Sequence, residues 1–163
     1  MLKRLITAIR RNHALEHATI AILLGRIGHS RRIVGRAAPD GFYIYCDTPT
    51  EKIRDSALEG LARLQRGESH LAVSALCGTN IAVAGILAGM ASALALGSRS
   101  RLERLPNALA AAMLAVLAAQ PLGRLVQKYY TTSPDLDGLE IVSVEPMGKR
   151  FPNLYKVRTA TRA

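Results

Sequence analysis

Aromatic residues and cysteines are scarce in this sequence of 163 residues. Phe, Tyr and Trp together make up 4% of it, so the 49% of hydrophobic residues consists mostly of Ala, Leu, Ile and Val. This bias suits helices that pack closely together. The two cysteines, Cys46 and Cys77, lack the dense, even spacing of a secreted disulfide framework, and we expect reduced thiols. A chain of this length suits one compact domain.

Several signatures of well-known protein classes are missing from the sequence. It has no G-x-x-x-x-G-K-[ST], G-x-G-x-x-G, G-x-S-x-G or paired C-x-x-C motif, so nucleotide hydrolysis, dinucleotide redox chemistry and zinc-ribbon binding have no basis here. Residues 1–13 carry charge in every turn and lack the apolar core of a signal peptide. The formal charge of +10 favours anionic partners such as lipid headgroups. Because the basic residues are not interleaved with aromatic ones, we expect no binding to nucleic acid.

Two long stretches without charge dominate the second half of the chain. They run from Asn80 to Gly97 and from Leu105 to Leu125, with only Arg124 near the end of the second. Each is long enough to cross a hydrocarbon core of about 30 Å. A small soluble domain would have to wrap both helices on all sides, which remains the alternative because both are rich in Ala. The pattern therefore predicts a transmembrane helical hairpin.

The remaining sequence predicts two water-facing helices. Apolar residues recur at helical spacing from Leu2 to about Leu24, where Gly25 offers a stop, so the first is a long amphipathic helix. The segment Thr48-Pro49-Thr50-Glu51 has the spacing of a capping box, with Pro at the first helical position. It predicts the start of a second helix that continues to Gly67.

Four short segments predict β-strands that can pair into one antiparallel sheet. RRIVGRA and FYIYCD flank the turn residues Pro39-Asp40-Gly41, and LEIVSVE and LYKVRT flank a loop that contains Pro and Gly. The fold class is therefore an α+β membrane protein. We expect residues 1–79 to face water, residues 80–125 to form the hairpin, and residues 126–163 to complete the water-facing domain. We place the protein as a multi-pass protein in the cytoplasmic membrane, with both termini in the cytoplasm.

Ionisable residues interrupt the apolar stripe of the first helix. His13 and either Glu16 or His17 continue the stripe, whose apolar members are Leu2, Ile6, Ile9, Ile20 and Leu24. Burying such groups costs free energy unless they pair or coordinate a cation. Since His13 and His17 lie one helical turn apart, they predict a divalent metal site, with zinc as the expected ion. One alternative without metal is a hydrogen bond between the Glu16 carboxylate and His13 or His17. Another is a helix on the membrane surface with its lysines and arginines at the headgroups, which can coexist with a metal site.

A zinc site needs at least one further protein ligand. Three candidates precede the first apolar stretch, and we rank them as His70, then Cys77, then Glu68. Cys77 also begins the segment Cys-Gly-Thr-Asn, which is typical of a turn and helix cap, so a purely structural role competes with metal binding at this position.

The segment His13-Ala14-Leu15-Glu16-His17 resembles the H-x-x-E-H motif of the inverzincin zinc proteases. This resemblance covers five residues. It implies that His13 and His17 bind zinc and that Glu16 is the general base acting on zinc-bound water. The further downstream glutamate of those larger proteases has no counterpart in the sequence.

A broader resemblance covers most of the chain. The segments RRNHALEHATIAIL, CGTN and QKYYTTSPDLDGLEI together resemble an uncharacterised family of small bacterial membrane proteins that carries a domain of unknown function. The resemblance implies a membrane location and a recurring H-A-L-E-H-A-T helix. It implies no activity.

Two functions of different classes follow from these features. The first is a membrane-anchored protein that binds a divalent metal and can act as a metal-dependent hydrolase. The second is a non-enzymatic structural or assembly subunit of a membrane complex, without metal. Anionic lipid headgroups are the expected partners of either, together with another membrane protein or a second copy of the chain.

Overall fold

The computed structural model describes residues 1–28, 32–97, 103–148 and 150–162. The chain divides into two compact units. The first, here called the α/β unit, combines Met1–Ser74 with Lys128–Ala163, and the second, here called the hairpin unit, is Ala75–Gln127. The two ends of the sequence therefore fold together, and the apolar segment is inserted between them.

The α/β unit contains a four-stranded antiparallel sheet with the strand order β1-β2-β4-β3. Its strands are β1 (Val34–Ala38), β2 (Gly41–Tyr45), β3 (Leu139–Pro146) and β4 (Leu154–Thr161). Each hairpin is local in sequence, and the pairing of β2 with β4 joins the two. The small antiparallel sheet predicted from the four apolar segments is confirmed.

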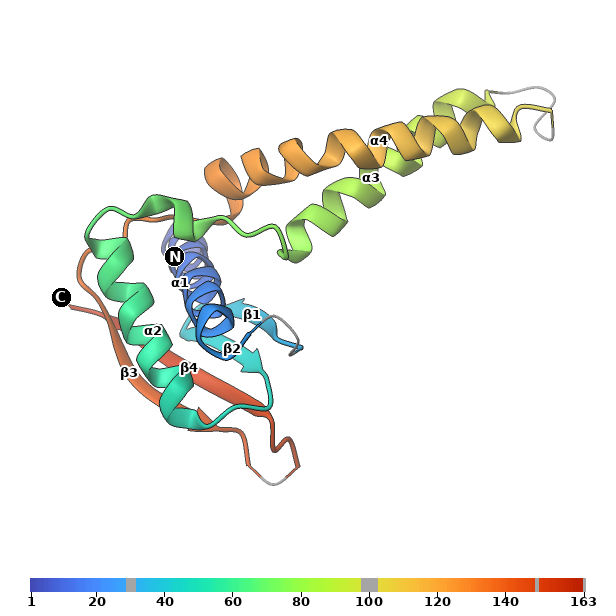
Figure 1. Ribbon diagram of the computed structural model, residues 1–163. Coiled ribbons are helices and arrows are strands. Elements are labelled where there is room, and N and C mark those ends of the chain that lie inside the picture. The colour runs from blue at the N-terminus through green and yellow to red at the C-terminus, as the bar shows by residue number, and fades with distance from the viewer. Residues whose placement is uncertain (29–31, 98–102, 149, 163) are drawn as a thin grey trace. The chain divides into compact units, whose positions relative to one another are not determined.

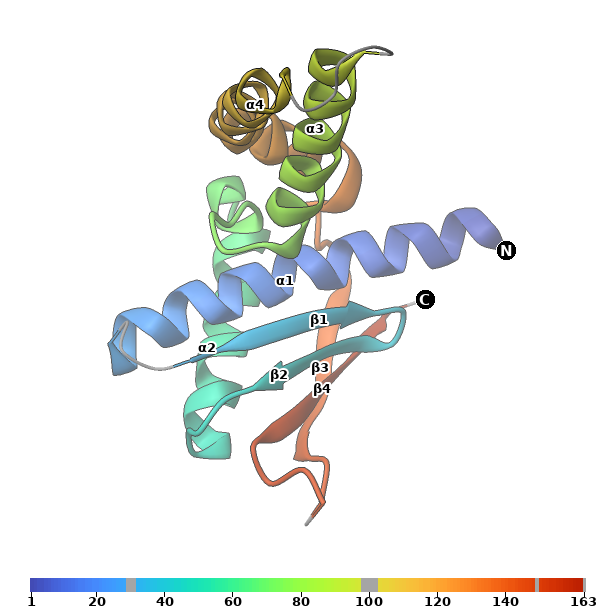
Figure 2. The ribbon, with the colours of Figure 1, turned by 90° about the vertical axis from the view of Figure 1, so that its right-hand side faces the viewer.

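Two helices cover one face of this sheet (Figures 1 and 2). They are α1 (Leu2–Ile27) and α2 (Thr50–Gln65), and a short 3-10 helix, η1 (Ser69–Ala72), follows α2. Alternate residues of the strands point towards these helices, as the period of two requires. The core between the two layers includes Leu15, Leu23, Phe42, Ile44, Ile53, Ala57, Leu64 and Val157.

The first helix departs from its predicted extent and face. It passes through Gly25 and ends at Ile27. Its C-cap, Gly28, has a φ of 84°, which favours glycine, and donates its N–H to the Leu24 carbonyl at 2.9 Å. A glycine inside a helix costs only about 1 kcal/mol, which packing elsewhere along α1 offsets. The predicted stripe is wrong at its start, because Leu2 and Ile6 are exposed. Burial begins in the middle of α1, where other segments cover it on several sides.

The start of α2 also differs in detail from its prediction. The helix begins at Thr50, and the carbonyl of Pro49 accepts hydrogen bonds from the N–H groups of Lys52 and Ile53. Thr48 makes no side-chain cap bond there, so the capping box is not formed. The predicted position of the helix is nevertheless correct to within about two residues.

The hairpin unit consists of two antiparallel helices, α3 (Gly78–Leu96) and α4 (Leu105–Val126). Both are long and apolar enough to cross a membrane, and few of their residues are buried. A π-helical turn, η2 (Gln127–Thr131), continues α4. The charged residues that separate the two apolar stretches in the sequence lie partly outside the described part of the chain.

A polar contact closes the base of the helical hairpin. The side-chain amide of Gln127 donates to Asn80 Oδ1 at 2.8 Å, and Asn80 donates to the carbonyl of Ala75 at 3.0 Å. A Cβ atom at Gly123 would lie 2.2 Å from Asn80 Oδ1, so α4 needs glycine at this position for the close approach. α3 and α4 are therefore fixed to each other by their polar residues at one end.

Candidate metal centre

The middle of α1 holds the C-terminal segment of the α/β unit in place. The guanidinium of Arg10 donates to the carbonyls of Tyr129 and Thr132, each at 3.0 Å, and the N–H of Ser133 donates back to the Arg10 carbonyl at 3.0 Å. Arg11 donates to the carbonyls of Asp135 and Asp137. These arginines therefore bind protein carbonyls of the α/β unit.

His13 and His17 project from the next turns of α1 towards two different segments. Nδ1 of His13 lies 2.9 Å from the carbonyl oxygen of Thr131, and Nδ1 of His17 lies 2.7 Å from that of Ala72. A carbonyl oxygen only accepts hydrogen bonds, so Nδ1 carries the proton in both rings. In the neutral imidazole, the lone pair is then on Nε2.

The Nε2 atom of His17 is buried and has no hydrogen-bond partner among the described residues. His17 as a whole is 4% exposed. Buried polar atoms of this kind almost always have a partner, so this nitrogen calls for an explanation. A bound cation would provide one.

The two imidazole rings lie side by side. Their centroids are 4.4 Å apart. Each ring offers one nitrogen as a metal ligand, and these two nitrogens lie within 4.8 Å of each other. Two nitrogens of a tetrahedral zinc site are about 3.3 Å apart, given Zn–N distances of about 2.0–2.1 Å. The separation of at most 4.8 Å is compatible with that spacing.

The hydrogen bonds of both rings match those of zinc-bound histidines. A metal-ligating histidine usually donates its other ring N–H to a carbonyl or carboxylate, which fixes the tautomer and orients the ring. His13 and His17 both do so through Nδ1. The residues present therefore fit a divalent ion that accepts nitrogen ligands.

Glu16 lies on another side of α1 and contacts the sheet. A Cβ atom at Gly35 of β1 would lie 2.1 Å from Glu16 Oε1, so the carboxyl group fills the space that this glycine leaves open. Glu16 is 5% exposed. The structure thus brings the rings of His13 and His17 together. The carboxylate of Glu16 points towards β1.

The other predicted ligands occupy separate places. His70 is an exposed residue of η1. The carboxylate of Glu68 accepts hydrogen bonds from Arg63 at 2.6 and 2.8 Å, and this arginine holds the pKa of Glu68 below its usual value. An ion pair of this kind satisfies the carboxylate without metal.

The two cysteines differ in their surroundings. Cys77 belongs to the hairpin unit, where it is the N-cap of α3 and its sulfur accepts a hydrogen bond from the N–H of Thr79 at 3.4 Å. The predicted cap is therefore present. Cys46 lies just beyond β2, and burial raises the pKa of its thiol, which disfavours the thiolate needed for metal binding.

Sequence reasoning did not find the carbonyl groups that orient the histidines. Ala72 and Thr131 lie 55 and 118 residues from their partners in the chain, and neither side chain takes part in the bond. The π-helical turn that ends at Thr131 was also missed. Such turns are frequent at functional sites, but they leave no distinct pattern in a sequence.

Comparisons with known proteins identify a family but no activity. A family described as "Domain of unknown function (DUF6391)" matches residues 8–144. An uncharacterized protein of Picosynechococcus sp. is 32% identical over 139 residues, which cover 79% of this chain and 68% of that protein. No solved structure matches the chain. The predicted resemblance to a family with a domain of unknown function is thus confirmed, and the chain belongs to the DUF6391 family.

Proposed function

We propose that this protein is a membrane-anchored protein that binds a divalent metal, with zinc as the preferred ion, through Nε2 of His13 and Nε2 of His17. One observation carries the proposal: Nε2 of His17 is buried without a hydrogen-bond partner among the described residues, while Nδ1 is fixed by a carbonyl. One turn earlier, Nδ1 of His13 likewise lies beside a carbonyl, that of Thr131, at 2.9 Å. Bound zinc supplies a Lewis-acidic centre or a structural cross-link.

Cys77 is our candidate for the third ligand. The chain itself restricts its distance from the histidines, because Ala72 accepts the hydrogen bond of His17 and Cys77 follows five residues later. Five residues span at most about 18 Å when fully extended. A thiolate is also a soft ligand that zinc prefers. His70 and Glu68 are weaker candidates, since one is exposed and the other is paired with arginine.

The proposed anchor is the hairpin of α3 and α4. Its support is the length and apolar surface of both helices, which an interior helix of a soluble protein would bury. We place it in the cytoplasmic membrane, with the basic α/β unit and both termini in the cytoplasm, where the net charge of +10 suits anionic headgroups.

Hydrolysis with Glu16 as general base is a narrower form of the proposal. It requires the carboxylate to leave the space beside Gly35 and turn towards the ion. Metal binding does not depend on this movement. We therefore propose binding as the function, and a hydrolytic reaction only if substitution of Glu16 by Gln abolishes an activity while the metal is retained.

Metal content of the full chain, purified in mild detergent and dialysed, tests the proposal. We expect about one zinc per chain in the parent protein, a large loss in His13→Ala and His17→Ala, and no loss in His70→Ala, the matched control. Cys77→Ser should lose metal and Cys46→Ser should keep it. Thermal unfolding by circular dichroism verifies that each variant is folded.

Two results would overturn metal binding. One is a parent protein with far less than one metal per chain after incubation with zinc, and the other is equal metal content in parent and His17→Ala. A stable, stoichiometric membrane partner found together with either result would instead favour the structural subunit.

A further inference from the structure

A cavity lies within the α/β unit, beside the segments whose carbonyls orient the histidines. Its volume is about 360 Å³, within the range of small-molecule sites. It is formed between η1 and the chain that follows α4. The residues around it are Ser69, His70, Ala72, Val73, Lys128, Tyr129, Thr132 and Pro134.

The charged and polar groups of this cavity favour an anion. Lys128 supplies an ammonium group, and Ser69, His70 and Tyr129 supply further possible donors. Among the described residues that form the cavity there is no carboxylate. The nearest acidic residue in sequence, Glu68, is already paired with arginine at 2.6 Å. An anion that enters would therefore meet a cation and no competing negative charge.

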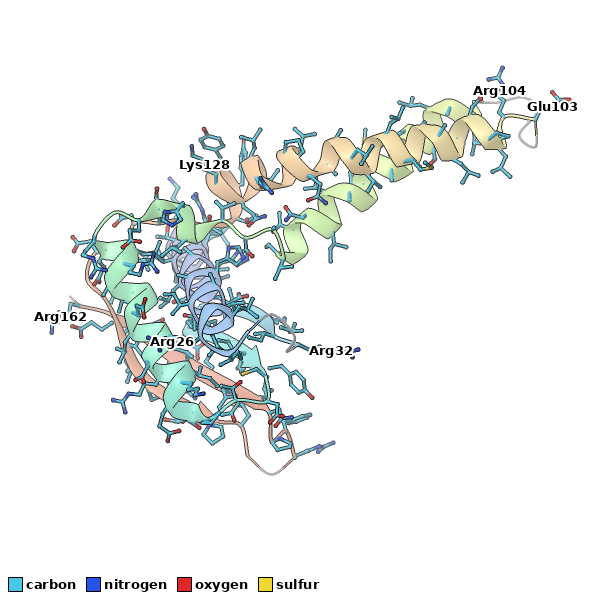
Figure 3. The ribbon with its side chains drawn as sticks, viewed as in Figure 1. Arg26, Arg32, Glu103, Arg104, Lys128 and Arg162 are labelled. Carbon is cyan, nitrogen blue, oxygen red and sulfur yellow. The ribbon has the colours of Figure 1, made fainter. Side chains whose placement is uncertain are left out.

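Lys128 follows the apolar helix α4 closely in sequence. It lies in η2, directly after α4, as Figure 3 shows. Its Nζ is 5.4 Å from the centroid of the Tyr129 ring. Tyr129 and Tyr130 are 58% and 75% exposed. Exposed tyrosines and a lysine at the end of an apolar helix are typical of the level at which lipid headgroups lie.

We propose that this cavity binds a phosphate group, with Lys128 and His70 as its principal contacts. The volume accommodates a phosphate together with a glycerol-sized substituent, and the exposed lysine provides charge-assisted hydrogen bonds to phosphate oxygens. The proposal that a phosphate group binds here depends only on the cavity. A lipid headgroup as its source rests in addition on the proposed membrane anchor.

Binding measurements on the full chain distinguish the two sources. Inorganic phosphate and glycerol phosphate are titrated by calorimetry into the protein in mild detergent. Flotation with vesicles of phosphatidylglycerol, compared with phosphatidylcholine, then tests the lipid on reconstituted protein. Saturable binding of the soluble probes indicates a free phosphate compound, and a preference for phosphatidylglycerol alone indicates a headgroup.

Variants locate the binding. Lys128→Gln and His70→Gln should each weaken binding about tenfold, as expected for the loss of a hydrogen bond to a phosphate oxygen. Lys52→Gln, which removes an exposed lysine of α2, is the matched control and should bind like the parent. Metal content should stay unchanged in all three, so failure here is distinguishable from failure of the metal proposal. Equal binding by Lys128→Gln and the parent, or no saturable binding of any probe, would overturn the inference.

Discussion

His13 and His17 use their Nδ1 atoms in the same way, although their carbonyl partners come from distant parts of the sequence. One partner follows α2 and the other follows α4. Each bond fixes a ring on the surface of α1 and leaves Nε2 as the lone-pair nitrogen. A buried histidine that served only packing would need a partner for both nitrogens. The Nε2 atom of His17, which has no hydrogen-bond partner among the described residues, is therefore the main reason to expect a bound ion at this site.

The contact of Glu16 with β1 gives a prediction for Gly35. Gly35→Ala places a methyl group within 2.1 Å of the present position of Glu16 Oε1, and this buried carboxylate has little room to move. We expect a loss of about 1–3 kcal/mol in stability, as for other overpacked sites. Thermal unfolding followed by circular dichroism measures it.

A second glycine of the same region is the control for this variant. Gly25 lies in α1, and no atom lies within 4 Å of the position that a Cβ atom would take there. Gly25→Ala should therefore leave the stability of the protein unchanged or raise it by up to about 1 kcal/mol. Metal content should remain unchanged in Gly35→Ala, because Glu16 is not a proposed ligand. If Gly35→Ala instead unfolds at the parent temperature, the placement of Glu16 against β1 is wrong.

The sequence predicted part of this site. The spacing of His13 and His17 was sufficient to place both rings on one side of a helix. Spacing was not sufficient to place the side chain of Glu16. From the helical period alone, its carboxylate could reach either the histidines or the sheet. Only the glycine in β1, a residue 19 positions away, shows which side the carboxylate takes. The role of Gly35 has no distinct signature in the sequence, since a glycine inside a strand can mark a bulge, a bend or a close approach of another group.

Periodicity and turn residues were sufficient to predict the helices and strands. The glycine and capping signals in the sequence did not predict all of the helix ends correctly. The four strands were correct because their turn residues and alternating patterns agree. Gly25 did not end α1, because tertiary packing outweighs a single unfavourable residue. The capping box before α2 was wrong for a related reason: its spacing is necessary for the cap but does not ensure the hydrogen bond.

The turn between β1 and β2 is attached to β4 by an ion pair whose effect depends on pH. Nζ of Lys156, a buried residue of β4, lies 2.6 Å from Asp40 Oδ1, and this hydrogen bond lowers the pKa of the Asp40 carboxyl. A carboxyl pKa that is lower in the folded state stabilises the fold above its unfolded pKa. That stabilisation is lost as the pH falls through the folded pKa.

Asp40→Asn should therefore destabilise the protein at about pH 7 and much less at about pH 3. We expect about 1–2 kcal/mol at the higher pH, because the buried ammonium of Lys156 loses its partner while the exposed Asp40 is screened by solvent. Melting temperatures at both pH values provide the measurement. Asp55→Asn, at an exposed position of α2, serves as the control and should change little at either pH. A difference between Asp40→Asn and the parent that is the same at both pH values would refute the pairing.

On the scale of the whole molecule, the sheet depends on both ends of the chain. Strands β2 and β4 pair with each other, although the entire hairpin unit separates them in sequence. The histidines of α1 likewise bind carbonyls on both sides of the insertion, at Ala72 and Thr131. The proposed metal centre therefore lies where the chain leaves the α/β unit and where it returns.

The identity of the ligand atoms is the most direct test of this account. X-ray absorption at the zinc edge of the zinc-loaded full chain measures them without any assumption about activity. We expect nitrogen neighbours from imidazole at about 2.0–2.1 Å from the zinc and one sulfur at about 2.3 Å, with the imidazole signal lost in His13→Ala/His17→Ala. Zinc surrounded only by oxygen, or an unchanged spectrum in the double variant, would contradict it.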